Sequence, residues 1–324
     1  MSQNVSTLSL IIPCYNEELT IERFYETICP ILQPLPYTIE FIFVDDGSKD
    51  LTVSKIESLH LKDERVKLIS LSRNFGKEGA LLAGMEAASG EALIVMDIDL
   101  QDPPSLIPQM LDYFEKGFDH IYTRRRNRVG EPLIRSWFAN LFYKIMNRIS
   151  EVEMVDGMRD YRLLSRKAVN ELLQLRESNR FSKGLFQWIG FDGVCIEFDH
   201  VERVAGDTKW SFFKLVNYAI EGITSFSNAP LRLSAYSGIF VAFIAFCYLL
   251  YIVYDTTVHG NPTAGWSSMV CVTLFLGGIQ LIGLGVVGEY VGRIYSEVKQ
   301  RPSYIVKRRL NLETDPEPES ARNQ

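Results

Sequence analysis

The first two thirds of the chain alternate between short apolar runs and amphipathic stretches. The apolar runs have the length and composition of strands buried on both faces, and the stretches between them repeat apolar side chains at helical spacing. Strands are expected at residues 8–12, 39–44, 66–71, 92–96, 119–123 and 194–198, and helices at 19–32, 51–61 and 79–88. This order predicts an α/β domain with a mostly parallel sheet covered by helices.

Two longer apolar stretches follow in the last third of the chain. Neither residues 233–254 nor residues 256–288 contain Asp, Glu, Lys or Arg, and each exceeds the roughly 20 residues that cross a bilayer core. The connection at 255–265 has no Lys or Arg, whereas Arg232 precedes the first stretch and Arg293 follows the second. The positive-inside rule therefore predicts two spanning helices with both chain ends in the cytosol.

Charge and cysteine content narrow the function classes. The formal charge of −6 at pH 7 argues against a general nucleic-acid binder. Basic residues gather near the apolar stretches, which favours anionic lipids or phosphates as partners. The five cysteines form no C-x-x-C pair, so neither a zinc knuckle nor a disulfide framework is expected. Residues 1–9 lack a basic n-region, and no cleavable signal peptide is expected.

An acidic cluster begins where the fourth apolar run ends. Asp97, Asp99 and Gln101 alternate there, at the strand end where open α/β sheets bind ligands. Their hard oxygen atoms suit Mg²⁺ or Mn²⁺, which leave positions free for substrate phosphates. This predicts a metal-diphosphate site. An acidic turn with Asp102 as helix N-cap and Pro104 in the first turn is an alternative, and both can hold together.

The loops after the first three strands bring more polar side chains to this edge. Residues 13–18 lack the G-x-G-x-x-G pattern, which disfavours a dinucleotide site. Asp45 could accept a hydrogen bond from a base N–H or a ribose hydroxyl, whereas Ser48 or Asp50 could simply cap a helix. Residues 72–78 carry polar groups to the same crevice. Three such loops beside an acidic cluster indicate one shared binding site more than a set of independent helix caps.

Four motifs together resemble the signature of family-two inverting glycosyltransferases of the GT-A fold. The motifs are Pro13-x-Tyr15-Asn16-Glu17, Val44-Asp45-Asp46-Gly47-Ser48, Ser72-Arg73-Asn74-Phe75-Gly76-Lys77 and Asp97-x-Asp99-x-Gln101-Asp102-Pro103-Pro104. More narrowly, they resemble the polyprenyl-phosphate glycosyltransferases, and the resemblance covers almost the whole chain. It implies a GT-A type, Rossmann-like domain with two C-terminal transmembrane helices.

The resemblance also implies roles for individual residues. The residues implied in nucleotide-sugar binding are Pro13, Tyr15, Glu17, Asp45, Asp46, Lys77 and Asp97. The implied ligands of Mg²⁺ or Mn²⁺ are Asp97, Asp99 and Gln101, and Asp99 is also implied in catalysis. No Q-x-x-R-W motif of processive synthases is present, which indicates transfer of a single sugar.

Residues 155–166 resemble the family's D-F-R-L element, with Tyr161 in place of Phe. The match places Asp160 and Arg162 at the acceptor site as catalytic residues, although Asp160 could be only a salt-bridge partner of Arg162. Asp156 remains a second candidate for the acidic group.

The acceptor phosphate is expected to bind basic side chains. Arg124, Arg128 and Arg162 are the candidates, because guanidinium groups match phosphate oxygens. A solvated basic loop is the alternative for residues 124–128. Two amphipathic segments, 133–149 and 209–226, contain Trp, Phe and basic residues that suit a membrane surface.

The sequence thus predicts four regions. They are a cytosolic GT-A domain at 1–208, an interfacial helix at 209–230, two transmembrane helices at 231–292 and a cytosolic basic segment at 293–324 that is disordered from residue 311. The expected function is metal-dependent transfer of one hexose, glucose from UDP-glucose, to undecaprenyl phosphate at a bacterial inner membrane, for O-antigen or cell-envelope glycan modification. The alternatives are a mannosyl or aminoarabinosyl donor, or a non-catalytic nucleotide-sugar-binding membrane subunit. Small residues at 277–285 would also allow a homo-oligomer through close helix packing.

Overall fold

The computed structural model describes residues 6–126, 148, 157–175, 177, 180–199, 227, 229–259 and 265–312. Nearly all of the expected amphipathic segments 133–149 and 209–226 lies outside these ranges, as do Arg128 and Asp156. The expected strands and helices among residues 8–198 agree with the structure to within a few residues, whereas the strand at 158–165 and the helices at 166–174 and 182–188 were not expected.

The first half of the chain alternates strands and helices as predicted. The strands are β1 (Thr7–Cys14), β2 (Thr38–Asp45), β3 (Val66–Leu71) and β4 (Ala92–Val95), and the helices between them are α1 (Ile21–Leu32), α2 (Thr52–His60) and α3 (Lys77–Ala87). After β4 come a 3₁₀ turn η1 (Pro104–Leu106), α4 (Ile107–Glu115), β5 (His120–Arg125), β6 (Met158–Ser165), α6 (Arg166–Gln174), α7 (Ser182–Trp188) and β7 (Gly193–Phe198).

One sheet contains all the strands of the described residues. Its order is β7-β5-β6-β4-β1-β2-β3-β8, where β8 is Val306–Leu310. Strands β1 to β4 pair in parallel, and β6 enters antiparallel between β4 and β5. Strand β8 is antiparallel to β3, and β7 is parallel to β5. The sheet is therefore mostly parallel, as expected, with two strands that run the other way.

Helices cover both faces of this sheet. On one face α1, α2 and α4 bury Phe24, Ile56 and Met110 against the strands. On the other face α3, α6 and α7 pack on them, and the eleven residues of α3 include an unbroken buried run from Gly79 to Met85. Such a buried helix explains why α3 shows little amphipathic pattern, because its glycines and alanines allow close packing on the sheet. Both faces of the strands are thus covered, as their apolar runs predicted.

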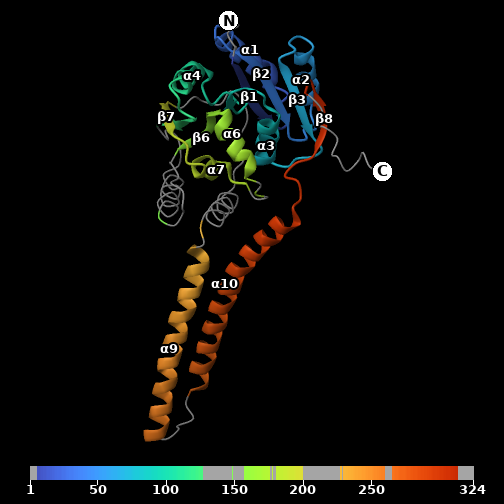
Figure 1. Cartoon of the computed structure of the whole chain (residues 1–324). Helices are drawn as coiled ribbons and strands as arrows, with labels where there is room; N and C mark the ends of the chain where they lie inside the picture. Colours follow the sequence, from blue (N-terminus) through green and yellow to red (C-terminus); the bar gives the residue numbers. More distant parts are fainter. Residues whose placement is uncertain are drawn as a thin grey trace, which may run out of the picture.

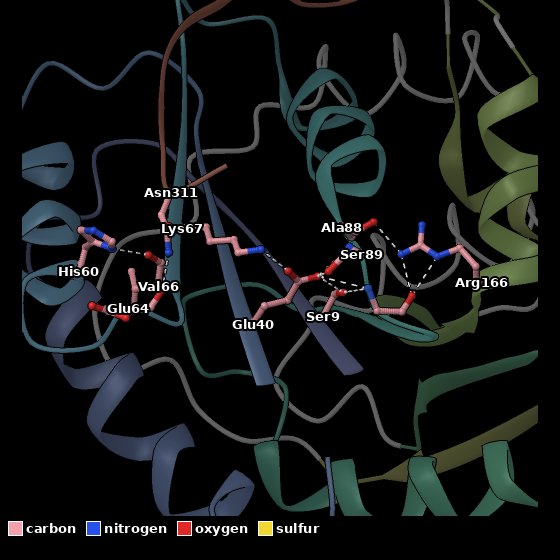
Figure 2. Close-up of polar contacts among 11 residues, drawn as sticks. Ser9, Glu40, His60, Glu64, Val66, Lys67, Ala88, Ser89, Arg166 and Asn311 are labelled. Atoms are coloured by element: carbon pink, nitrogen blue, oxygen red, sulfur yellow. Dashed lines mark hydrogen bonds and ion pairs between the residues drawn. The ribbon is translucent and has the colours of Figure 1, made fainter. Parts of the chain in front are cut away.

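A polar network lies at the amino-terminal edge of the central strands (Figure 2). Lys67 donates to Glu40 at 2.6 Å, and the backbone N–H of Ser89 donates to the same side chain at 2.7 Å. Ser9 also donates to Glu40, which is only 4% exposed. Arg166 donates to the carbonyl oxygens of Ala88 and Gly90 at 2.7 Å. These contacts tie the strands together at the edge opposite their carboxyl ends.

Two long helices extend from the domain on the side away from the chain's N-terminus (Figure 1). They are α9 (Ala229–His259) and α10 (Trp266–Lys299). The segments Ala229–Tyr248 and Phe275–Lys299 are long and apolar enough to cross a membrane, and none of either is buried. Helix α9 extends beyond the predicted stretch 233–254 at both ends, whereas α10 begins ten residues after position 256 and continues past position 288 to Lys299.

After α10 the chain returns to the domain and joins the sheet. Val306 pairs with Leu71, and the backbone N–H of Ser72 donates to the Ile305 carbonyl at 2.9 Å. Asn311, expected at the start of a disordered tail, instead donates to the Glu64 carbonyl at 2.6 Å. The chain from α10 thus arrives at the carboxyl end of β3, the edge that carries the polar loops.

Candidate functional site

A lysine held between two aspartates forms the centre of this edge. Lys77 is the first residue of α3, and its Nζ lies 2.6 Å from Asp97 Oδ1 and 2.7 Å from Asp160 Oδ2. Asp97 follows β4, whereas Asp160 is on β6, and the pairing of Val95 with Arg162 brings the two strands together. Residues far apart in the sequence therefore meet because β6 is inserted beside β4.

The three charges stabilise one another in their ionised forms. Burial alone would raise the pKa of Asp160, but the positive charges of Lys77, Lys183 and Arg162 hold it well below its usual range. Burial alone would lower the pKa of Lys77, but Asp160 and Asp97 raise it above its usual value. Asp160 and Lys77 therefore stabilise each other in their ionised forms.

The loop after β2 is built around two buried carboxylates. Asp45 accepts from the Ser48 backbone N–H at 3.0 Å and from Ser70 Oγ at 2.8 Å. Asp46 accepts from the backbone N–H groups of Phe75 and Gly76 at 2.7 and 2.9 Å. Burial raises the pKa of Asp46 although these hydrogen bonds lower it. Asp46 therefore ties the second loop to the third.

Gly47 lies between these loops in the left-handed region, with φ +74°. A Cβ at this position would stand 2.5 Å from the Arg73 carbonyl carbon. Only glycine fits such a close approach without a shift of the backbone. The Asp-Asp-Gly-Ser motif thus sets how near the second and third loops lie.

The loop after β1 is fixed to the same region by backbone donors. The N–H of Asn16 donates to Ser48 Oγ and that of Glu17 to Thr52 Oγ1, both at 2.8 Å. Pro13 is half-buried at the end of β1, and Tyr15 keeps 43% of its surface exposed. The structure therefore brings the predicted nucleotide-binding positions of the first two loops together at one edge.

The acidic cluster after β4 turns sharply at Leu100, which has φ +55°. The Gln101 backbone N–H donates to Asp99 Oδ1 at 3.2 Å. Asp102 is not the helix N-cap: its Oδ1 accepts from Arg159 Nε at 3.0 Å, and Pro103 precedes the 3₁₀ turn. Its Oδ2 is buried with no hydrogen-bond partner in the described part of the chain, and burial raises the pKa of Asp102 to about 6.

Asp97 and Asp99 form the candidate metal site. Among the described residues no three His, Cys, Asp or Glu side chains surround one point. Two carboxylates nevertheless fit a cation such as Mg²⁺, which takes one or two carboxylates and completes its coordination with substrate phosphates and water. The Gln101 side-chain oxygen instead accepts from Arg159 at 3.4 Å, so the geometry favours the two aspartates over Gln101 as ligands.

The predicted acceptor arginines have different surroundings. Arg162 is fully buried, with its guanidinium 3.8 Å from the Phe186 ring, and it donates to the Arg159 carbonyl at 2.7 Å. Burial lowers the pKa of Arg162 to about 10. This position favours a role in holding β6 around Asp160 over direct contact with a lipid phosphate. Arg124 on β5 is accessible, with 44% of its side chain exposed and Glu197 at 3.5 Å.

Sequence reasoning did not single out Arg159, although it contacts both Asp102 and Gln101. A signal was available, because alternate residues of a strand point to opposite faces. Arg159 and Tyr161 lie on one face of β6, and Asp160 and Arg162 on the other. The D-F-R-L resemblance drew attention to the second face alone.

An α/β sheet with polar loops and carboxylates at its carboxyl edge has the arrangement expected of a nucleotide-sugar-dependent transferase. The chain belongs to glycosyl transferase family 2, whose model matches residues 9–173. Residues 229–294 also match the GtrB C-terminal hairpin, which covers both α9 and most of α10. The expected enzyme class and fold are therefore confirmed.

Several relatives resemble nearly the full chain. The SfII prophage-derived bactoprenol glucosyl transferase of Shigella flexneri is 46% identical over 93% of this chain and 97% of its own. The prophage bactoprenol glucosyl transferase homolog of Escherichia coli K12 is 44% identical over 93% of this chain and 98% of its own. A solved glucosyl-3-phosphoglycerate synthase of Mycobacterium tuberculosis, in complex with Mn²⁺, UDP-glucose and phosphoglyceric acid, covers 68% of this chain and 78% of its own at 18% identity, with a TM-score of 0.44.

Proposed function

We propose that this protein transfers a single glucosyl residue from UDP-glucose to a polyprenyl phosphate at the cytosolic face of a bacterial inner membrane. The observation that carries the proposal is the near full-length similarity to bactoprenol glucosyl transferases, at 46% and 44% identity over 93% of the chain. The shared region includes both the strand-end loops and the two apolar helices. Glucose as the sugar and polyprenyl phosphate as the acceptor follow from those relatives.

The arrangement of the domain supports this proposal. The chain enters β8 from α10 at the carboxyl end of β3, the same edge as Lys77, Asp97 and Asp160. A lipid phosphate at the membrane surface would then meet the polar edge of the sheet. The proposed regions are a catalytic domain at 1–208 completed by β8, an interfacial segment at 209–230, two spanning helices at 231–292 and a cytosolic segment at 293–324.

The chemistry follows from the charges of this edge. Mg²⁺ or Mn²⁺ bound by Asp97 and Asp99 would neutralise the diphosphate leaving group. An acceptor phosphate monoester has a second pKa near 6, so its oxygen is already largely anionic at neutral pH. Asp160 has a low proton affinity because Lys77 lies beside it. Asp160 would therefore orient the acceptor or Lys77 and would not take up a proton, while Arg124 attracts the lipid phosphate.

Attack of the phosphate oxygen from the face opposite the diphosphate would invert the anomeric configuration. The phosphate carries its own negative charge to the sugar, so the protein's main task is to position both reactants. The buried guanidinium of Arg162 and the backbone contacts of Asp46 keep the surrounding loops in place.

The decisive experiment uses purified full-length protein with a panel of labelled nucleotide sugars and polyprenyl phosphate. The extracted lipid should carry label from UDP-glucose, and each labelled lipid should carry one sugar. Asp99→Asn should lower turnover on the order of 10²-fold through lost charge stabilisation. Asp112→Asn, at an exposed position on α4, is the matched control. Full activity in EDTA, or label transferred only from another nucleotide sugar, would contradict the proposal.

A further inference from the structure

A cavity lies where the chain leaves α10 and joins the sheet. Its volume is about 1050 Å³, and its walls come from α3, the end of α6 and the segment between α10 and β8. Leu82, Leu173 and Tyr304 line it. None of Lys77, Asp97 and Asp160 does, although α3 begins with Lys77 and contributes to both places. The cavity therefore shares no lining residue with the cluster of Lys77, Asp97 and Asp160.

The cavity walls carry more positive than negative charge. Five basic residues line the cavity, Arg180, Arg301, Lys307, Arg308 and Arg309, beside two acidic residues, Glu86 and Glu297. Arg308 pairs with Glu57, and the Tyr304 hydroxyl donates to Glu86. Arg301 and Lys307 are exposed. A concave surface with this charge excess favours an anion.

Arg180 contributes a half-buried cation to this wall. Its guanidinium donates to the carbonyl oxygens of Leu172 and Leu175, which end α6. Its Nε is buried without a hydrogen-bond partner in the described ranges. Burial lowers the pKa of Arg180, because water no longer stabilises the charge. A bound anion would compensate this loss of hydration.

The position of the cavity selects the kind of anion. The apolar segment Phe275–Lys299 ends immediately before Gln300, which lines the cavity. If α10 spans the membrane, as the proposed function requires, its last turns at 293–299 cross the lipid headgroup layer, and the cavity lies on the cytosolic side of that layer, next to the lipid phosphates. Phosphate oxygens are strong acceptors for guanidinium and ammonium donors, and phospholipids present them at this depth.

We propose that this cavity binds the phosphate group of an anionic membrane phospholipid, separately from the polyprenyl phosphate acceptor. A phospholipid held there contacts α3, α6 and β8 together. Because β8 follows directly from α10, the bound headgroup fixes how the catalytic edge faces the bilayer. The lipid acts as a structural ligand and takes no part in the transfer reaction.

The test is native mass spectrometry of the full-length protein in detergent, with phosphatidylglycerol as the anionic probe and phosphatidylcholine, which is zwitterionic and has no net charge, as the comparison. Arg301→Gln with Lys307→Gln removes two exposed charges from the cavity. Each of the two substitutions should weaken phosphatidylglycerol binding roughly fivefold, so the double variant should bind phosphatidylglycerol on the order of 25-fold less tightly than wild type. Lys62→Gln with Lys116→Gln is the control, because both exposed lysines precede strands at the amino-terminal edge of the sheet.

Arg180→Gln provides a second test, with thermal unfolding measured to confirm that the variant is folded. It should lower phosphatidylglycerol binding, and Asp99→Asn should leave that binding unchanged even if transfer activity is lost. The experiment can therefore reject the phospholipid site without rejecting the proposed transfer reaction, and the reverse. Equal binding of the two phospholipids, or no loss in the double variant, would overturn the proposal. Displacement of the lipid by millimolar inorganic phosphate would assign the cavity to a free anion instead.

Discussion

Replacement of Lys77 by methionine tests whether the lysine and a divalent cation compete for Asp97. Methionine keeps the length of the side chain and removes its charge. Lys77 lies 2.6 Å from Asp97 and 2.7 Å from Asp160, and the lysine side chain is 38% exposed. Loss of this charge leaves two neighbouring carboxylates with no intramolecular cation between them. We expect the Lys77→Met protein to bind Mn²⁺ more tightly in the absence of nucleotide.

The size of the effect follows from Coulomb's law with solvent screening. Two unit charges about 4 Å apart interact by about 4 kcal/mol near a protein surface and by about 1 kcal/mol in bulk water. Because Lys77 is more than one third exposed, a value near the lower limit applies, about 1.4 kcal/mol at Asp97. This corresponds to an approximately tenfold lower dissociation constant for Mn²⁺.

The measurement is a Mn²⁺ titration followed by electron paramagnetic resonance at constant ionic strength. Lys55→Met is the matched control, since Lys55 pairs with Glu22 on α1 at 3.1 Å, away from the strand-end site. Higher salt should reduce the difference between wild type and Lys77→Met. Unchanged or weaker Mn²⁺ binding in Lys77→Met would refute the view that the lysine occupies the metal position on Asp97.

Three further predictions concern other parts of the chain. Glu40→Gln should lower the free energy of unfolding at pH 7 by about 2 kcal/mol. Desolvation raises the pKa of the buried Glu40 carboxylate, but the hydrogen bonds that it accepts lower this pKa below its usual value, so the difference in stability between wild type and Glu40→Gln should shrink below about pH 4. Urea unfolding at several pH values measures this difference. Arg124→Ala should raise KM for the lipid phosphate and leave KM for the nucleotide sugar unchanged, whereas Arg162→Ala should mainly lower the melting temperature; equal melting temperatures would contradict the buried role of Arg162. A single cysteine at His259 in a cysteine-free background should react with an impermeant thiol reagent from the periplasmic side, and reaction only after lysis would reverse the topology.

The sequence predicts which loops lie together at the catalytic edge, because their position depends only on where each parallel strand ends. Parallel strands end at one edge of the sheet, so loops that follow β1, β2, β3 and β4 must lie together. The apolar runs identified those strands, and the motifs after them identified the loops. This reasoning needed no knowledge of how distant segments pair.

The contact between Lys77 and Asp160 could not be predicted in the same way. It depends on β6 running antiparallel between β4 and β5, and the residues of β6 do not specify their partner strands. The burial of Arg162 was also missed, because a motif match treats arginine as a phosphate ligand. In the strand it shares a face with Leu164, and both are buried on the side covered by α7.

Strand β8 was missed for a different reason. Its sequence, Val306 to Leu310, contains three consecutive basic residues and follows a long apolar helix. Such a segment is typical of a positively charged cytosolic flank. Charged side chains are equally typical of an exposed edge strand, where they discourage pairing with other molecules. Composition alone therefore fits both structures.

The place of β8 in the chain has a consequence for biosynthesis. The strand that completes the edge of the sheet beside β3 is made after both helices of the hairpin. While the ribosome synthesises α9 and α10, β3 has no β8 beside it and exposes its backbone hydrogen-bonding groups. The sheet can reach its final form only after both helices have been synthesised, so β8 is the last strand that can join it.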